Sequence, residues 1–532
     1  MPGGLMNLVS YGQQNVILNG NPSKTFFKST YAQYTNFGLQ KFRVDFEGSR
    51  TLRLTEESTF DFKIPRYADL LMDTYISFEL PHIWSPVYYD DLSDNYIPYE
   101  FKWIDDIGSK MINKITITCG NQTLQEYSGD YLLASVQRDY SREKKDLYDR
   151  MTGNTPELND PANSGVRYNT YPNAFYFPLN NPVDSEPSIR GRILYIPLNS
   201  WFMYKSQMAL PLTSLQYNEL HITITFKPIC ELFRIRDVKD RENDYPYVAP
   251  NFNNAYMQFF RFLQTPPEEQ ITNDTVFPDT RTLWNTDIHL NCTYCFLSND
   301  EARLFALNEQ KYLFRQVTEK RFNNVTGNNK IDLKSLGMVC SNLFYFQRND
   351  VNLRNEWSNY TNWDYKNLPY DIALYTPGIG YPLFPVSGVI HGENEKDILV
   401  NMAILLDGSY RENAQPVGIY NYIEKYIRTN GNAPDGLYCY NYCMNTNPYD
   451  MQPSGAINMN RFNQVELEFA TIRPPLDENA QTKTFCDENG VIIGINKPTW
   501  RIYTYNYDLV VFEERINVIT FVGGNCGLMY AT

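Results

Sequence analysis

The chain lacks the features that mark most secreted and membrane-inserted proteins. No run in its 532 residues approaches 18 consecutive apolar positions, so we expect no membrane-spanning helix. Residues 1–15, MPGGLMNLVSYGQQN, contain neither a basic segment nor a long apolar core, so we also expect no signal peptide. Pro2 stands where N-terminal myristoylation needs a glycine. These absences point away from secretion and from direct membrane insertion.

Positive charge is also scarce. The chain has 47 Lys and Arg against 61 Asp and Glu, a formal net charge of −14. A protein that wraps nucleic acid needs cationic side chains to displace the counterions of the phosphates. We therefore expect no direct nucleic-acid binding, and the acidic balance fits a scaffold or self-assembling protein better.

Catalytic motifs are missing. No phosphate-binding loop and no nucleophile motif occurs, so we predict no catalytic residue, no cofactor-binding residue and no cofactor. Carboxylates are numerous, which leaves a pair suited to glycoside hydrolysis open. The chain has only four histidines: His82, His221, His289 and His391.

The nine cysteines are an odd number, and without a secretory signal they predict free thiols in a reducing compartment. Cys292 and Cys295, together with Cys439 and Cys443, could supply four zinc thiolates. However, positions 292 and 295 face opposite sides of a strand. Because buried free cysteine behaves as a small hydrophobic residue, we predict that these thiols belong to the core and bind no metal.

The abundant residue types indicate an all-β protein. Aromatic residues reach 15%, with 42 Tyr and 31 Phe, which favour pleated and half-buried surfaces. The clearest strand pattern runs over residues 220–227, where apolar and polar residues alternate without a break. A period of two predicts a strand with one buried face, formed here by Leu220, Ile222, Ile224 and Phe226.

This strand pattern has a second copy. Residues 453–469, PSGAINMNRFNQVELEF, repeat the pattern of residues 209–228. Two further landmarks repeat in the same order: residues 61–63 match 332–334, and the alternation over 288–296 matches 503–511. The sequence separation between the two members of each matching pair decreases along the chain, as expected if the first copy carries longer loops. An accidental match of three short strands is the alternative.

We predict two tandem antiparallel eight-stranded jelly-roll sandwiches, with long loops and a few short helices. Residues 1–30 form an N-terminal arm that holds a partner, 31–299 the first jelly-roll domain, and 300–532 the second. Residues 141–192 are polar and rich in Asn and Pro, and we expect them to form a surface insertion that projects away from the sandwich.

Two helices are also predicted. The apolar positions Leu132, Leu133 and Val136 share one helical face within residues 128–140. Ser298 and Glu301 have the spacing of a capping box, which predicts a helix that starts there and continues through Tyr312.

Several segments along the whole chain resemble the major capsid proteins of nucleocytoplasmic large DNA viruses. The resemblance rests on residues 4–37, on ALPLTSLQYNELHI at 209–222, on LSNDEARLFA at 297–306 and on PSGAINMNRFNQVEL at 453–467. The closing segment GGNCGLMY at 523–530 is similar too, but it departs from the usual family pattern at Asn525 and Cys526.

The resemblance implies a double jelly-roll capsid protein that forms a homotrimer, a pseudo-hexameric capsomer that tiles an icosahedral virion assembled in the host cytoplasm. Its implied partners are neighbouring capsomers, and minor capsid and penton proteins that meet the arm and the capsomer base, close to an inner membrane. The alternatives are a carbohydrate-binding or glycan-cleaving β-sandwich protein, and a minor capsid or spike protein with the same fold.

Overall fold

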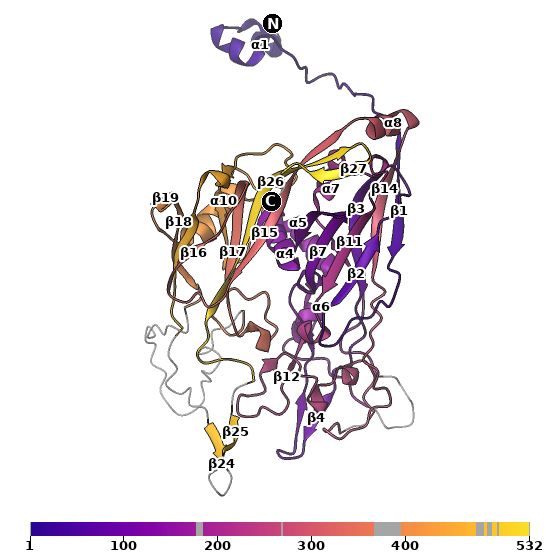
Figure 1. The fold of residues 1–532 in the computed structure, drawn as a ribbon, viewed down its shortest axis with the longest axis vertical. Coiled ribbons are helices and arrows are strands. Elements are labelled where there is room, and N and C mark those ends of the chain that lie inside the picture. Colours follow the sequence, from indigo (N-terminus) through magenta and orange to yellow (C-terminus); the bar gives the residue numbers. More distant parts are fainter. Residues whose placement is uncertain are drawn as a thin grey trace.

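The computed structural model contains two antiparallel β-sandwiches that lie side by side, with an N-terminal arm that leaves one end of the first (Figure 1). It describes residues 2–176, 185–267, 270–366, 395–474, 483–486, 492–496 and 499–530. None of the helices in these ranges is long and apolar enough to cross a bilayer.

The first sandwich is organised around strand β11 (Leu220–Phe226), whose alternate residues are buried as predicted. Its sheet has the order β2 (Ser58–Lys63), β11, β7 (Ile112–Cys119) and β8 (Gln122–Tyr127). The facing sheet has the order β1 (Phe37–Asp45), β14 (His289–Leu297), β3 (Leu70–Glu79) and β10 (Leu210–Pro211), and β9 (Ile193–Pro197) also pairs with β3.

The second sandwich repeats this plan. One sheet has the order β16 (Asn328–Asp332), β23 (Val465–Thr471), β18 (Leu399–Leu406) and β19 (Ser409–Tyr410), and β20 (Gln415–Pro416) also pairs with β18. The other has the order β15 (Gln310–Phe322), β26 (Tyr507–Val522), β17 (Met338–Arg348) and β21 (Leu437–Asn441), with β22 (Ile457–Asn458) on β17 and β27 (Asn525–Leu528) on β26.

The repeated sequence landmarks occupy equivalent places in the two sandwiches. Strands β11 and β23 are second in their sheets, β2 and β16 are first, and β14 and β26 are second in the facing sheets. The duplication inferred from the alternating patterns is therefore present in the strand order. Short extra strands make the sheets five- and four-stranded in the first sandwich and six- and five-stranded in the second, so the expectation of eight strands in each stays a prediction.

One of the two predicted helices is confirmed and the other is shorter than expected. Helix α4 (Gly129–Asp139) starts after Ser128, whose hydroxyl accepts a hydrogen bond from the Tyr131 N–H at 3.2 Å. Helix α8 (Asn299–Leu307) follows Ser298, but the serine side chain makes no capping bond. It ends before Tyr312, because Tyr312 already belongs to β15. There it pairs with Ile519 in the long antiparallel ladder between β15 and β26.

The prediction that residues 141–192 project away from the sandwich is wrong for the described part of this segment. It forms α5 (Arg142–Thr152) and α6 (Pro156–Asn159), and Tyr148, Leu158 and Tyr171 are buried. The Tyr148 hydroxyl lies 2.6 Å from Ser109 Oγ of α3 (Ile107–Lys110). Although the segment is polar overall, its few large apolar side chains are enough to pack it against the sandwich.

The remaining elements are short. Strands β4, β12 and the β24–β25 pair lie at the end of the molecule opposite the arm (Figure 1). Their bounds, and those of the other short elements, are β4 Val87–Asp90, β5 Asn95–Pro98, β6 Lys102–Trp103, β12 Phe233–Arg236, β13 Tyr247–Val248, β24 Lys483–Cys486, β25 Ile492–Asn496, α1 Gly3–Val9, α2 Val16–Asn19, α7 Trp201–Tyr204, η10 Ile419–Ile423 and α10 Glu424–Arg428.

The largest apolar core does not stop at the boundary between the sandwiches. It includes Trp103 and Trp201 of the first sandwich together with Phe314 and Phe512 of the second. The rings of Trp201 and Phe314 lie 5.4 Å apart. A smaller cluster around Phe346 and Leu467 fills the interior of the second sandwich. Because one core is shared, the two sandwiches are packed as a single unit.

Candidate functional site

The residues considered for metal or catalytic chemistry are dispersed. His221 Nδ1 contacts Asp61 Oδ2 at 2.9 Å on the outer face of β11, whereas His289 Nδ1 contacts the Asp287 carbonyl at 2.6 Å on β14. His82 accepts a hydrogen bond from the Gly191 N–H at 3.1 Å, and His391 lies outside the described residues. Within the described ranges, no group of three or more His, Cys, Asp or Glu side chains could hold a metal ion.

The four cysteines considered as zinc ligands are buried. Cys292 and Cys439 belong to the core shared by the two sandwiches, whereas Cys295 belongs to a small separate cluster with Leu70 and Ala209. Burial raises the pKa of the Cys292 and Cys439 thiols to about 12. Neutral thiols in apolar surroundings are poor metal ligands, in keeping with a packing role.

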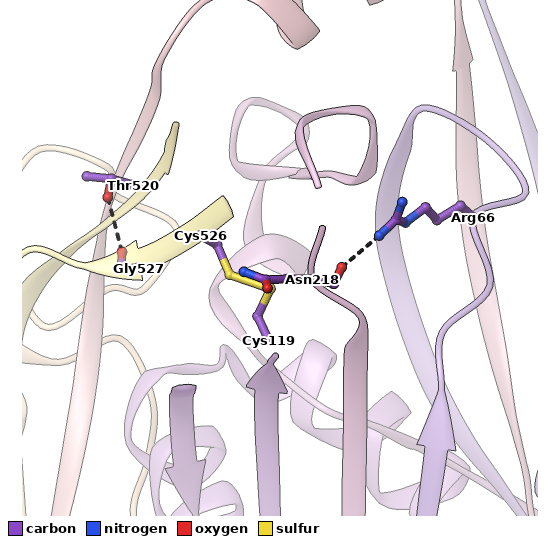
Figure 2. The surroundings of a disulfide bond; sticks show 6 residues. All are labelled: Arg66, Cys119, Asn218, Thr520, Cys526 and Gly527. Carbon is purple, nitrogen blue, oxygen red and sulfur yellow. Dashed lines mark hydrogen bonds between the residues drawn. A yellow bond between two sulfur atoms is a disulfide. The ribbon is translucent and has the colours of Figure 1, made fainter. Parts of the chain in front are cut away.

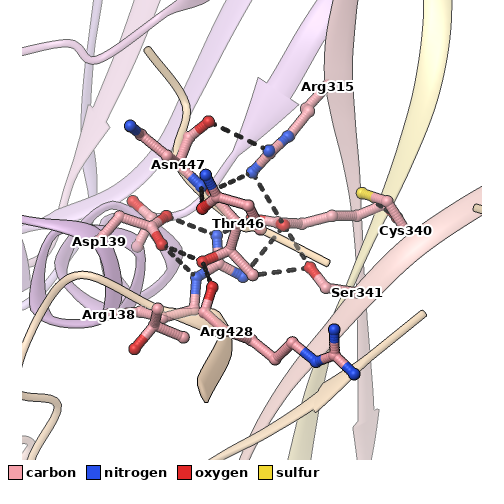
Figure 3. A network of polar contacts seen from close by, with 12 residues as sticks. Arg138, Asp139, Arg315, Cys340, Ser341, Arg428, Thr446 and Asn447 are labelled. Atoms are coloured by element: carbon pink, nitrogen blue, oxygen red, sulfur yellow. Dashed lines mark hydrogen bonds and ion pairs between the residues drawn. The ribbon is translucent and has the colours of Figure 1, made fainter. Parts of the chain in front are cut away.

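A buried polar network lies between the two sandwiches (Figure 3). Arg138, near the end of α4, donates hydrogen bonds to Glu514 of β26 at 2.9 and 3.0 Å and to Asp139 at 2.6 and 3.0 Å. Thr446 donates to Asp139 at 2.6 Å. The first sandwich supplies Arg138 and Asp139, and the second supplies the other partners. The constellation, here called the junction network, therefore links the two halves directly.

Burial and the neighbouring arginines act in opposite directions on the acids of the junction network. Burial alone would raise the pKa of Glu514, but Arg138 and Arg315 outweigh it and lower that pKa to about 2. Burial raises the pKa of Asp139 despite the neighbouring Arg138. The side chains of Arg138 and Glu514 are each about 1% exposed, so water does not solvate either charge. Each charge is therefore stabilised by the other.

A second buried contact joins the sandwiches nearby. Lys110 of α3 binds Asp130 at 2.7 Å and donates to the Tyr360 hydroxyl at 3.1 Å. Arg321 of β15 reaches the other oxygen of Asp130 at 3.3 Å. Burial would raise the pKa of Asp130, but Lys110 above all holds it far below its ordinary value. The carboxylate of Asp130 is thus held by cations from both halves.

A disulfide between Cys119 and Cys526 corrects the expectation that the thiols are free (Figure 2). Cys119 ends β7 in the first sandwich, and Cys526 lies in β27, which pairs with β26 in the second. The Gly524 carbonyl beside it accepts hydrogen bonds from the N–H groups of Gln216 and Tyr217 at 3.0 and 3.2 Å. The pairing was not foreseeable because the partners are 407 residues apart in the sequence.

The N-terminal arm exposes many large apolar side chains. Helices α1 and α2 have no buried residue, and Ile17, Phe26 and Phe27 are at least 85% exposed. Residues 2–23 contain no Asp, Glu, Lys, Arg or His. Such a surface is rare on a protein that acts alone and marks an interaction site.

The sequence reasoning missed the residues that join the halves, namely Arg138, Glu514 and the Cys119–Cys526 pair. One signal was available, because Glu513, Glu514 and Arg515 interrupt an apolar strand pattern in β26. Three charges inside a buried strand imply buried partners, although they do not identify them.

Comparisons with known proteins agree with this architecture. The family model for the major capsid protein N-terminus matches residues 25–261, and the model for the large eukaryotic DNA virus major capsid protein matches residues 301–527. The major capsid protein of Phaeocystis pouchetii virus is 29% identical over 66% of this chain, a match that spans 60% of that protein. The major capsid protein of Paramecium bursaria Chlorella virus 1 is 23% identical over 100% of both chains.

Solved structures show the same fold. The structure of PBCV-1 VP54 aligns with a TM-score of 0.63 at 17% identity, covering 96% of this chain and 100% of that one. The Faustovirus major capsid protein aligns with a TM-score of 0.59 at 12% identity, covering 93% and 92%. The two family models together span most of the sequence, and the aligned structures are double jelly-roll capsid proteins. The chain therefore belongs to the major capsid protein family of large eukaryotic DNA viruses.

Proposed function

We propose that the chain is the repeating unit of an icosahedral shell, in which three copies form a pseudo-hexameric capsomer. The observation that carries this proposal is the matching strand order of the two sandwiches. Three chains with two similar lobes each present six similar lobes around one axis, so that a threefold particle fits a hexagonal lattice.

The contacts between the sandwiches support the same proposal. The two lobes of one chain can occupy two of the six similar positions around the axis only if the angle between the lobes is fixed. The shared apolar core, the junction network and the Cys119–Cys526 disulfide all cross this boundary. They restrict the relative motion of the lobes and favour one geometry in every copy.

The roles that we propose for the segments of the chain follow the predicted domain boundaries. Residues 31–299 and 300–532 are the two lobes, and residues 1–30 are an arm that binds minor capsid and penton proteins below the capsomer. Assembly takes place in the host cytoplasm, next to an inner membrane, with neighbouring capsomers as the main partners. We propose no enzymatic activity and no direct contact with nucleic acid, since the work of the chain is assembly.

Gel filtration with multi-angle light scattering tests the trimer. We expect the purified chain to have three times the mass of one 62.2 kDa chain. A stable monomer at micromolar concentration would contradict the proposal.

Particle composition tests the role in the shell. A lattice protein is the dominant band of purified particles on a stained gel, whereas a minor capsid or spike protein of the same fold is a faint one. A cryo-electron density map of the particle should show a double-lobed chain repeated over the whole shell.

A further inference from the structure

The disulfide joins two hairpins that belong to different lobes. Cys119 is the last residue of β7, before the turn at Gly120 that leads into β8. Cys526 lies in β27, which follows the turn at Gly523 and Gly524. Figure 2 shows the two side chains meeting between the end of β7 and β27. The bond therefore ties the C-terminal hairpin of the second lobe, formed by the end of β26 and β27, to the first lobe.

The C-terminal hairpin is also docked on the first lobe by contacts other than the disulfide. The Gly524 carbonyl accepts hydrogen bonds from the N–H groups of Gln216 and Tyr217 at 3.0 and 3.2 Å. A Cβ atom at position 524 would lie 2.8 Å from the Tyr217 ring, so the two backbones approach each other closely here. Leu528 of β27 packs against the apolar core that the lobes share. The fold itself therefore brings the two cysteines together, and the bond can close without a rearrangement.

One of the two cysteines can be reached from outside. Cys526 is half-buried, whereas Cys119 is only 1% exposed. Among the six free cysteines of the described residues, only Cys230 is not buried, and burial still raises the pKa of its thiol to about 11. A thiol exchanges with a small disulfide as its thiolate, and only where that reagent has access to it. Exchange should therefore start at Cys526 and be completed by Cys119.

We propose that the Cys119–Cys526 bond is a redox-operated staple. The chain folds and assembles with two thiols, and the bond closes after the shell has left the host cell. This inference rests on the cytoplasmic assembly proposed above, because cytoplasmic thiols keep accessible cysteines reduced whereas disulfides persist outside the cell. Before closure the shared core and the junction network join the lobes, and after closure a covalent bond joins them as well.

The step is a thiol–disulfide exchange, and glutathione disulfide is the class of oxidant that it needs. The Cys526 thiolate attacks one sulfur of glutathione disulfide, so that a mixed disulfide forms and one glutathione thiolate leaves. The Cys119 thiolate then attacks the Cys526 sulfur and displaces the second glutathione. Two cysteine thiols become one disulfide, and the two protons that they lose go to the two glutathione thiolates. Glutathione in the cytoplasm of the next host cell drives the same steps in reverse, so the staple opens where the shell has to come apart.

Glutathione buffers test the staple on the purified full-length chain. The chain is equilibrated in a reducing buffer or in an oxidising buffer, quenched with acid, unfolded and labelled with a maleimide before peptide mass spectrometry. We expect Cys119 and Cys526 to be labelled after the reducing buffer and protected after the oxidising one, with labelling lower by roughly tenfold or more. A pair that stays protected in the reducing buffer, or stays labelled in the oxidising one, would overturn the inference.

Variants of the pair test the order of the exchange. In the oxidising buffer Cys119→Ser should accumulate a glutathione adduct on Cys526, because the second attack is missing. Cys526→Ser should leave Cys119 free, because Cys119 is buried. Cys230→Ser is the matched control and should keep the wild-type response, since Cys230 is a free cysteine outside the pair. An adduct on Cys119 in place of Cys526 would contradict the proposed point of attack.

Melting temperatures in the two buffers test whether the bond holds the lobes. The wild type should melt at a higher temperature in the oxidising buffer, and Cys526→Ser should melt at the same temperature in both. Equal melting temperatures for the wild type would show that the bond has no effect as a staple. Light scattering separates this inference from the proposed function: a wild type that is not a trimer contradicts the function, whereas the labelling tests the staple in a chain of any oligomeric state.

Particles from infected cells test the timing. Cells and medium are quenched with acid separately, and the particles from each are unfolded and labelled with a maleimide. Particles inside the cells should carry the label on Cys119 and Cys526, and particles from the medium should not. A closed bond in particles inside the cells, or an open one in particles from the medium, would overturn the proposed timing.

Discussion

Arg138 and Glu514 are 376 residues apart in the sequence, yet two hydrogen bonds of 2.9 and 3.0 Å join their buried side chains. Neither residue has access to water, so each charge is compensated only by its partners in the junction network. The contact links an α-helix of the first sandwich to a central strand of the second. Several properties of the molecule should therefore depend on it.

Replacing Glu514 with Gln should weaken the junction. The amide keeps the shape of the side chain but removes the charge that faces Arg138, and breaking one side of a buried ion pair costs about 3 kcal/mol or more. We expect the free energy of unfolding to fall by about this amount in chemical denaturation. Glu219→Gln is a control that should change the free energy far less, because Glu219 and its partner Lys63 are both more than half exposed.

Acid should loosen the junction in a defined pH range. The pKa of Glu514 is lowered from 4.5 to about 2, so its contribution to stability is complete above pH 4.5 and is lost between pH 4.5 and 2. Asp139 acts in the opposite sense, because its raised pKa makes the folded state bind a proton more readily than the unfolded chain above about pH 4. Unfolding measured from pH 4.5 downward should show a steeper loss of stability in the wild type than in Glu514→Gln; parallel curves would contradict this.

Reduction of the Cys119–Cys526 disulfide should lower stability by about 2–4 kcal/mol, because the bond restricts the unfolded chain. Cys526→Ser should reproduce the effect, and adding reductant to that variant should change nothing further. Cys439→Ser is the contrasting case, because Cys439 is free and its variant should keep its response to reductant. Melting temperatures with and without dithiothreitol distinguish the two behaviours.

Deleting residues 2–25 should leave the fold unchanged, because α1 and α2 bury no residue. We expect the truncated chain to keep its trimer and its melting temperature but to yield fewer particles when expressed with its partner proteins. Particle counts by electron microscopy measure the effect. Loss of soluble trimer would show that the arm stabilises the lobes themselves.

The sequence was most informative where the pattern is local. The alternation over Leu220–Phe226 and the helical face of Leu132, Leu133 and Val136 each identified an element, and the repeated landmarks identified the duplication. These signals depend on neighbours within a few residues, so they can be read without knowing the fold.

The failures concern contacts between distant segments. A polar composition suggested that residues 141–192 project away, but Tyr148 and Leu158 pack inward because the sandwich offers a surface for them. Neither the Cys119–Cys526 pair nor the Arg138–Glu514 pair leaves a local pattern, because each partner is chosen by the three-dimensional packing.

The pairing of β1 with β14 also determines when this protein can fold. Phe37 pairs with Leu297 at the start of this ladder and Asp45 pairs with His289 at its end. During translation the ribosome must therefore release almost 300 residues before the first lobe can close its sheet, and β1 waits with an unpaired edge until then. Non-local pairing of this kind makes folding slow and leaves nascent strands open to aggregation.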